Sequence, residues 1–499
     1  MRLPLPPFRP ALDTLAARLR ETWPTLTPVI VALASAAVLV LGGCASSAGI
    51  TPGAQVIAPE QAGLVDGAAP AGVADTWWRG FGDSQLDALV ERALAGSPSL
   101  KLAQTRVARA EAAVAGQQSA DGLQVGADLN ATRQRFSGTS IYPPPLGGSV
   151  RTLATAQVGA SWEFDFFGRN HAAIEAAIGA QRAAVAEAQA ARVALASAVV
   201  RQYVQLARLQ AQRDVASRSL QQRGETLQLI KQRVQGGLDT AVELRQGEGA
   251  LPETRQQIEL FDEQITLTRH ALAALTAQPP EALATLDAPL RSVQLAALPA
   301  VLPADLLARR PDITAARWRI EAAGQDMKSA KAAFYPNINL TAFAGLSSIG
   351  LDHLVKSASE QYGVGPALHL PIFDAGRLRA NLRVKTADLD AAVESYNAAV
   401  LEAVHEAADP ISSLRAIERQ QAEQAQAQTA AESAHDLALQ RYRAGLSTYL
   451  TVLNAEAGVL NQRRQAVDLK ARALDAQVAL IKALGGGTAP DTTLASASR

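Results

Sequence analysis

The segment Ser161-Trp162-Glu163-Phe164-Asp165-Phe166-Phe167-Gly168-Arg169 decides the architecture, because it joins an alternating, strand-like stretch to a long stretch almost free of Gly and Pro. Its last two residues return 208 positions later as Gly376-Arg377. The same spacing relates three more pairs of features, which are Gly237-Leu238 and Gly445-Leu446, Thr240 and Thr448, and Glu248 and Glu456. The chain is therefore predicted to contain two similar halves, each a strand region followed by helices.

Two stretches poor in Gly and Pro predict unusually long helices. Residues 168–235 and 377–443 are rich in Ala, Gln, Arg and Leu, with Pro410 as the exception. Each would form a helix about 100 Å long at 1.5 Å per residue, a length typical of coiled coils. A Gly-containing turn ends each one, and second helices are expected over 240–277 and 448–484. Two helical hairpins with their tips at the same end follow, and Pro410 is expected to kink its helix.

Four segments alternate between apolar and polar residues, as membrane strands do. They cover about 123–136, 153–166, 337–347 and 362–370, and each is about ten residues long. Four strands cannot close a barrel alone, and their outer edges would be exposed. The sequence therefore leaves two possibilities open, a soluble sheet with one solvated face or a barrel that several chains share.

The N-terminal residues are predicted to be an export signal. Arginines precede an apolar run, Val29 to Leu41, that is too short to span a membrane and suits a signal peptide. The run ends in Gly42-Gly43-Cys44, which resembles the lipobox of bacterial lipoproteins, and Cys44 is the single cysteine of the chain. The alternative is a chance Gly-Gly-Cys after an ordinary helix. By the same resemblance Cys44 carries the lipid anchor and Ala45 favours the outer membrane. After Cys44 no uninterrupted apolar stretch approaches spanning length.

Composition excludes several classes of function. The 499 residues carry 47 basic and 47 acidic side chains, a balance that argues against nucleic-acid binding. One cysteine excludes an intrachain disulfide and a multi-thiolate metal site. The six histidines lack metalloprotease spacing, and Gly485-Gly486-Gly487 fits a helix stop better than a phosphate loop. We therefore expect no enzyme activity, no cofactor and no metal.

An ordered set of motifs resembles one family from end to end after Cys44. The chain is similar to the TolC-like outer-membrane factors, in the lipoprotein branch of NodT type that serves resistance–nodulation–division (RND) efflux pumps. The motifs are Trp77-Trp78, Phe81-Gly82-Asp83, Ser161-Trp162-Glu163-Phe164-Asp165, Arg309-Arg310-Pro311-Asp312-Ile313, Phe334-Tyr335-Pro336-Asn337-Ile338, Leu370-Pro371-Ile372-Phe373-Asp374-Ala375-Gly376-Arg377, Tyr442-Arg443-Ala444-Gly445 and Leu484-Gly485-Gly486-Gly487.

The resemblance implies an α+β membrane protein that works as a homotrimer. Three chains with four strands each would close a twelve-stranded barrel in the outer membrane of a Gram-negative bacterium. The hairpins would continue it as a periplasmic tunnel that meets an adaptor protein and an inner-membrane RND-type transporter. The implied function is a passive exit duct for drugs or other small toxic compounds, in contact with outer-membrane lipids. The alternative is a periplasmic coiled-coil structural or adaptor lipoprotein without a channel.

The expected domain division follows the two halves. It consists of a signal peptide (1–43), a lipidated N-terminal segment (44–76), a first repeat (77–290) with the hairpin 168–277, a second repeat (291–485) with the hairpin 376–484, and a polar C-terminal tail (486–499).

The hairpin tips are the first candidate site. The resemblance places adaptor contact at Gly237, Leu238, Gly445 and Leu446, where a small residue allows close backbone approach and an exposed Leu anchors a partner. The alternative is plain turn chemistry, with each Leu packed locally.

The periplasmic gate is the second candidate site. The resemblance implies acidic residues after the second tip, but here the corresponding positions are Thr451 and Asn454. A neutral constriction would not make a cation-selective charge ring, so we expect weak block by cations. Tyr442 and Arg443 are candidates for a latch between the hairpins, and a solvated helix face is the alternative.

Overall fold

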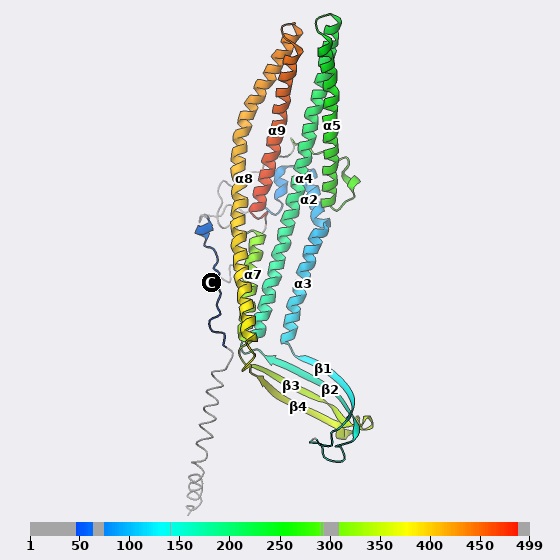
Figure 1. The fold of residues 1–499 in the computed structure, drawn as a ribbon, viewed down its shortest axis with the longest axis vertical. Coiled ribbons are helices and arrows are strands. Elements are labelled where there is room, and N and C mark those ends of the chain that lie inside the picture. Colours follow the sequence, from blue (N-terminus) through cyan, green and yellow to red (C-terminus); the bar gives the residue numbers. More distant parts are fainter. Residues whose placement is uncertain (1–45, 63–73, 140, 291–292, 294–308, 488–499) are drawn as a thin grey trace, which may run out of the picture. The chain divides into compact units, whose positions relative to one another are not determined.

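The structure is a computed structural model that describes residues 46–62, 74–139, 141–290, 293 and 309–487 (Figure 1). The expected signal peptide, Cys44 and most of the C-terminal tail lie outside the described residues. The chain divides into two compact units. Among the described residues, the first contains 46–53, 114–176 and 323–390, and the second contains the remainder. Each unit takes residues from both sequence halves.

The first unit contains one antiparallel sheet in the order β1-β2-β3-β4. Its strands are β1 (Gln124–Arg135), β2 (Val150–Phe164), β3 (Asn337–Ile349) and β4 (Glu360–His369), within a few residues of the expected segments. The register places apolar residues opposite one another, because Val158 pairs with Ala127 on one side and Ala344 on the other. Trp162 likewise pairs with Leu340, which pairs with Pro366. One face of the sheet is therefore apolar across all four strands.

An aspartate caps the start of each long helix. Asp165 follows β2, and its carboxylate accepts a hydrogen bond of 2.7 Å from the backbone N–H of His171 in α4 (Arg169–Gln235). Asp374 follows β4 and accepts one of 2.7 Å from Leu378 in α8 (Arg377–Arg443). A carboxylate that accepts from first-turn N–H groups stabilises a helix start. Each long helix therefore begins just after an Asp that follows a strand, although α4 begins five residues after the end of β2 and α8 begins eight residues after the end of β4.

The second unit is built on two helical hairpins. α4 and α8 have 67 residues each, and α5 (Ala241–Leu275) and α9 (Tyr449–Ala483) have 35 each. Corresponding helix ends are 208 residues apart, and both tips lie at the same end (Figure 1). The shorter helices α2 (Ser84–Gly96), α3 (Pro98–Asp121) and α7 (Pro311–Ala332) complete the helical part.

Among the described helices, α4 alone is long and apolar enough to span a membrane by length and composition, with a mean hydropathy of 1.4 in its best window. Charged residues such as Arg192 and Arg201 interrupt this helix, so it contains no uninterrupted apolar stretch of spanning length. α4 supplies much of the apolar core around Tyr203 and Leu206, which are fully buried. We attribute its apolar composition to that core.

Arg310 explains the Arg-Arg-Pro-Asp motif. Its buried guanidinium contacts Asp312 at 2.7 Å, Glu406 of α8 at 2.6 Å and the carbonyl of Ala483 at 3.2 Å. One side chain thus joins the start of α7 to α8 and to the last residue of α9. Pro410, four residues after Glu406, lies inside α8 without ending it.

Candidate functional site at the hairpin tips

The two tips are closed by the same backbone turn. Gly237 and Gly445 have positive φ angles of 71° and 75°. The N–H groups of Leu238 and Leu446 each donate 2.8 Å hydrogen bonds, to the carbonyls of Arg233 and Arg441. This six-residue closure is a Schellman cap, which needs a left-handed residue at the position of the glycine. Gly is therefore required by the turn itself.

The leucines that follow the glycines point into solvent. Leu238 is 68% exposed and Leu446 is 69% exposed. A leucine that served only as a local staple would be packed against its own helix. The exposure leaves one apolar side chain at each tip available to a partner.

A latch joins the first tip to the second hairpin. Asp239, which follows Leu238, accepts hydrogen bonds from the Arg233 guanidinium at 2.9 and 3.3 Å and from the hydroxyl of Tyr442 in α8. The guanidinium also lies 4.6 Å from the centre of the Tyr442 ring. We name Arg233, Asp239 and Tyr442 the tip latch. It brings together the ends of α4, α5 and α8.

The electrostatics of the tip latch favour an ionised Asp239. Burial alone would raise the pKa of this carboxyl, but the hydrogen bonds from Arg233 and Tyr442 outweigh it and hold the pKa below its ordinary value. Burial and the neighbouring carboxylate raise the pKa of Tyr442, so its hydroxyl stays protonated and donates. The latch is therefore a charge-assisted network.

A second tie lies further along the hairpins. Arg223 of α4 contacts Glu456 of α9 at 2.8 Å and the hydroxyl of Thr254 in α5 at 2.9 Å, and Ser219 donates to Glu456 at 3.1 Å. The Arg223 and Glu456 side chains are 12% and 10% exposed. A nearly buried pair of this kind is costly to break from one side.

The structure separates the residues predicted for the gate. Tyr442 is fully buried in the tip latch, whereas Thr451 and Asn454 lie on an exposed side of α9. Arg443 is exposed. The pairing of Tyr442 with Asp239 is not predictable from a local pattern, because the two residues are 203 positions apart in sequence. Glu456 repeats Glu248 but is buried against Arg223, which no local pattern indicates.

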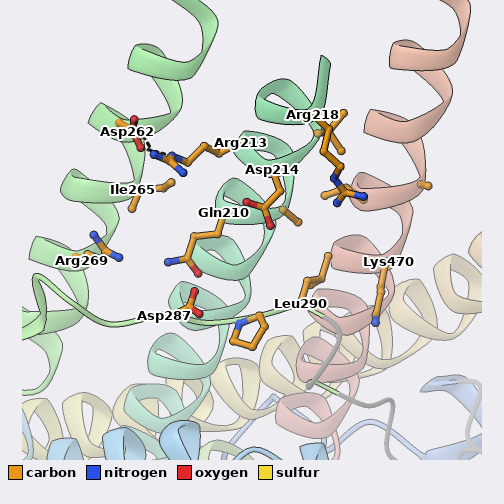
Figure 2. A pocket seen from close by; sticks show the side chains of 15 residues that line it. Gln210, Arg213, Asp214, Arg218, Asp262, Ile265, Arg269, Asp287, Leu290 and Lys470 are labelled. Carbon is orange, nitrogen blue, oxygen red and sulfur yellow. Dashed lines mark hydrogen bonds and ion pairs between the residues drawn. The ribbon is translucent and has the colours of Figure 1, made fainter. Parts of the chain in front are cut away.

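A cavity of about 750 Å³ lies beside α4, away from the tips (Figure 2). Its polar groups mostly hold the chain together: Arg213 pairs with Asp262 of α5 at 2.5 Å, and Arg269 donates to the carbonyl of Leu286 at 2.7 Å. Gln210 accepts a 2.7 Å hydrogen bond from the N–H of Ala288. Basic and acidic side chains alternate around it, so the cavity has no single charge preference.

Comparison with known proteins identifies the family. The model of the family described as outer membrane efflux protein matches residues 89–278 and 302–486, and the chain belongs to this family. The multidrug resistance outer membrane protein MdtP of Escherichia coli K12 is 33% identical over 463 residues, 90% of this chain and 94% of the relative. The pyoverdine export outer membrane protein OpmQ of Pseudomonas aeruginosa is 32% identical over 460 residues, 91% and 96% of the two chains.

Solved structures have the same fold. The outer membrane protein VceC of Vibrio cholerae superposes with a TM-score of 0.78 at 37% identity, covering 83% of this chain and 100% of that one. The open state of the MtrE outer membrane channel of Neisseria gonorrhoeae gives 0.75 at 27% identity, covering 89% and 98%. The expected fold class, outer-membrane location and efflux-channel function are confirmed, and the alternative of a lipoprotein without a channel is not supported.

Proposed function

We propose that this protein is the exit duct of a tripartite efflux pump and works as a homotrimer. Three four-stranded sheets would close one twelve-stranded barrel, and the hairpins would continue it as a tunnel. The observation that carries this proposal is the open sheet. Among the described residues, β1 and β4 each pair with one strand only, while an apolar face runs across all four. In lipid, unpaired edges must find partners, and equivalent edges on other copies supply them.

The lipid anchor at Cys44 is part of the same proposal. The first described residues after it are held near the start of α8, where Arg379 donates to the carbonyls of Ser46 and Ala48. Further along, Asp390 accepts a 2.9 Å hydrogen bond from the N–H of Gly53. α8 begins eight residues after the last residue of β4. An acyl group on Cys44 would then lie close to the sheet that enters the membrane.

The tips would bind a periplasmic adaptor protein, which in turn recruits an inner-membrane transporter of RND type. Gly237, Leu238, Gly445 and Leu446 present two exposed leucines on identical turns, and this supports their role as anchors. The tip latch would hold the tunnel closed until the adaptor separates the hairpins. Drugs or other small toxic compounds would pass without any catalytic step or cofactor.

The first test is the native mass of the protein extracted from outer membranes in detergent, compared with a Cys44→Ser variant. We expect particles of three chains for both, because sheet closure needs three copies and the lipid serves only as an anchor. A single chain in both preparations would refute the shared barrel and with it the exit duct.

A further inference from the structure

The two repeated Gly-Arg pairs come together at one pocket. Gly168 and Gly376 have positive φ angles of 71° and 87°, and the arginines that follow them are the first residues of α4 and α8. Both Arg169 and Arg377 line a cavity of about 220 Å³ in the first unit, whose other walls come from the ends of the strands. The repeat therefore places two guanidinium groups, from corresponding positions of the two halves, around one cavity.

The β3 and β4 residues that line this pocket belong to the polar face of the sheet. Asn337 pairs with His369 across these two strands. The next residue, Ile338, pairs with Phe164 and with Leu368 on the apolar face. Adjacent residues of a strand project to opposite faces. In the proposed barrel the apolar face meets lipid, so Asn337 and His369 face the conduction path.

The two acidic side chains of the pocket are already engaged. Asp165 accepts from the N–H of His171 at the positive end of α4. Glu163 lies 3.6 Å from the guanidinium of Arg169, an ion pair that is too long for a hydrogen bond. Within the part of the chain that the structure describes, the guanidinium of Arg377 has no hydrogen-bond or ion-pair partner. One cation is therefore left uncompensated, which suits one bound anion.

An unpartnered amide lies in the same wall. The side-chain oxygen of Asn337 is buried and has no hydrogen-bond partner among the described residues. Buried polar groups are ordinarily paired with protein, water or ligand. A half-turn of the amide presents its NH₂ group instead of its oxygen, so Asn337 can donate to an acid group held at Arg377.

An aromatic stack gives the pocket an apolar side. The rings of Phe167 and Tyr335 lie 4.9 Å apart and nearly parallel, at 11°. They are 46% and 49% exposed, and both line the pocket. An apolar cavity of about 150 Å³ holds benzene, so about 220 Å³ is sufficient for one ring that carries a carboxylate. The pocket thus combines a flat apolar surface with a free guanidinium.

We propose that this pocket binds small aromatic carboxylic acids on their way through the duct. The carboxylate lies on Arg377 and the ring lies against the stacked Phe167 and Tyr335. A guanidinium forms two parallel hydrogen bonds with a carboxylate, which gives the site its preference for acids. Every residue that lines the pocket comes from one chain, so a trimer carries three sites. This inference rests on the proposed function and names a class of cargo for it.

Benzoate binding tests the site directly. Benzoate is titrated into the detergent-extracted protein and followed by saturation-transfer NMR, with empty micelles as the blank. We expect saturable binding. Benzyl alcohol keeps the ring but lacks the charge, and it should bind at least roughly tenfold more weakly.

Variants of Arg377 show whether the bound acid lies where we propose. Arg377→Gln removes the uncompensated cation and should weaken benzoate binding at least roughly tenfold. Arg377→Lys keeps the charge without the planar fork and should weaken it less. The matched control is Arg383→Gln, which removes an exposed arginine six residues further along α8 and should bind benzoate as the wild type does.

Thiol labelling tests whether the pocket opens to the conduction path. Arg377→Cys in a Cys44→Ser background carries the single thiol of the chain. A charged, membrane-impermeant methanethiosulfonate reagent should change its single-channel conductance in planar bilayers, and benzoate should slow the reaction. The Cys44→Ser protein alone should not respond. No change of conductance after complete labelling would place the pocket outside the path and overturn the proposal.

The possible failures are distinguishable. A native trimer that does not bind benzoate, or binds it equally well after Arg377→Gln, would overturn the pocket and leave the exit duct standing. A phospholipid that co-purifies with the wild type, is lost in Arg377→Gln and excludes benzoate would assign the pocket to a lipid headgroup and overturn it equally. A native mass of one chain would instead refute the exit duct itself.

Discussion

At the scale of single residues, Asp239 is where the two hairpins converge. Its carboxylate accepts from Arg233 of its own hairpin and from Tyr442 of the other. Asp239 has no acidic counterpart in the second tip, where Ser447 stands 208 positions later. The latch is thus a feature of one contact between hairpins, and its loss would loosen that contact without altering either turn.

Tyr442→Phe removes the hydroxyl that reaches Asp239 and leaves the ring beneath Arg233. A hydrogen bond to a charged group contributes about 1.5–3 kcal/mol. If the latch holds the duct closed, the closed-to-open ratio should fall by roughly tenfold to a hundredfold. The measurement is the resting conductance of the purified protein in planar bilayers.

The control for this variant is Tyr449→Phe, which alters a buried tyrosine whose ring lies 6.0 Å from that of Tyr442. It should leave the resting conductance near that of the wild type. Equal leak from both variants would show that general loosening of the tip, and not the latch, raises the conductance.

Acidification should loosen the latch only at low pH. The pKa of Asp239 is lower in the folded protein than the value of about 3.9 for an unperturbed Asp. Its contribution is therefore fully present above that unperturbed value and is lost as the pH falls through the lowered one. Resting conductance should stay flat from neutral pH to about pH 5 and rise below about pH 4.

Asp239→Asn should abolish this rise, because the amide does not titrate. Its conductance should be higher than wild type at neutral pH and should not change in the same acid range. A wild-type rise that survives in the Asn variant would assign the pH dependence to another group.

Some of the tip residues can be predicted from the sequence and others cannot. Gly237 and Gly445 are predictable because a helix end followed by a second helix needs a left-handed position. The burial of Tyr442 is not, because Tyr-Arg-Ala-Gly reads equally well as an exposed last turn. Its burial depends on Ile230, Val452 and Tyr449, which come from other helices in the same cluster.

At the scale of elements, the strands make the sharper prediction. Val158 and Gln157 are neighbours near the middle of β2 and project to opposite faces of the sheet. Val158 is on the apolar face that we assign to lipid, where an Arg at the bilayer midplane costs about 2–4 kcal/mol. Val158→Arg should therefore reduce the folded protein in purified outer membranes, measured by its heat-dependent mobility on gels.

Gln157→Arg is the matched control, because it places the same side chain one residue away on the polar face. It should assemble at close to wild-type levels. Equal loss in both variants would mean that β2 does not present its apolar face to lipid.

The contacts that surround Pro410 in α8 cannot be predicted from the helix sequence alone. Pro410, where a kink is expected, does not end α8, because the helix continues for 33 more residues, to Arg443. Glu406, whose carbonyl loses a donor to Pro410, is held through its side chain by Arg310 and Lys482. Those partners are remote in sequence, so the local pattern predicts the weak point but not the contacts that compensate for it.

At the scale of the whole molecule, the repeat can be predicted from the sequence, because corresponding helices of the two halves have equal lengths. A constant offset of 208 predicts that corresponding helices have equal lengths, and the structure has two helices of 67 residues and two of 35. The two compact units cannot be predicted from the sequence repeat, because each unit combines strands or helices from both halves. Contact across halves depends on side chains such as Arg208 and Asp468, which the periodic pattern treats as ordinary exposed charges.

The closed end of an assembled trimer would be lined by neutral side chains. Three copies would place three Thr451 and three Asn454 side chains around one axis, and both are exposed on α9. Rings of carboxylates concentrate multivalent cations in a narrow passage, whereas amides and hydroxyls carry no net charge to do so. Micromolar trivalent cation should therefore leave the single-channel conductance nearly unchanged.

A Thr451→Asp/Asn454→Asp variant should acquire the block, and the block should weaken as salt is raised, since screening shortens the reach of the added charges. A neutral Thr451→Ser/Asn454→Gln variant should behave like the wild type. Strong block of the wild type, unchanged in all three proteins, would place the cation site elsewhere in the tunnel. Block that appears only with the two carboxylates would show that these two positions of α9 face the conduction path.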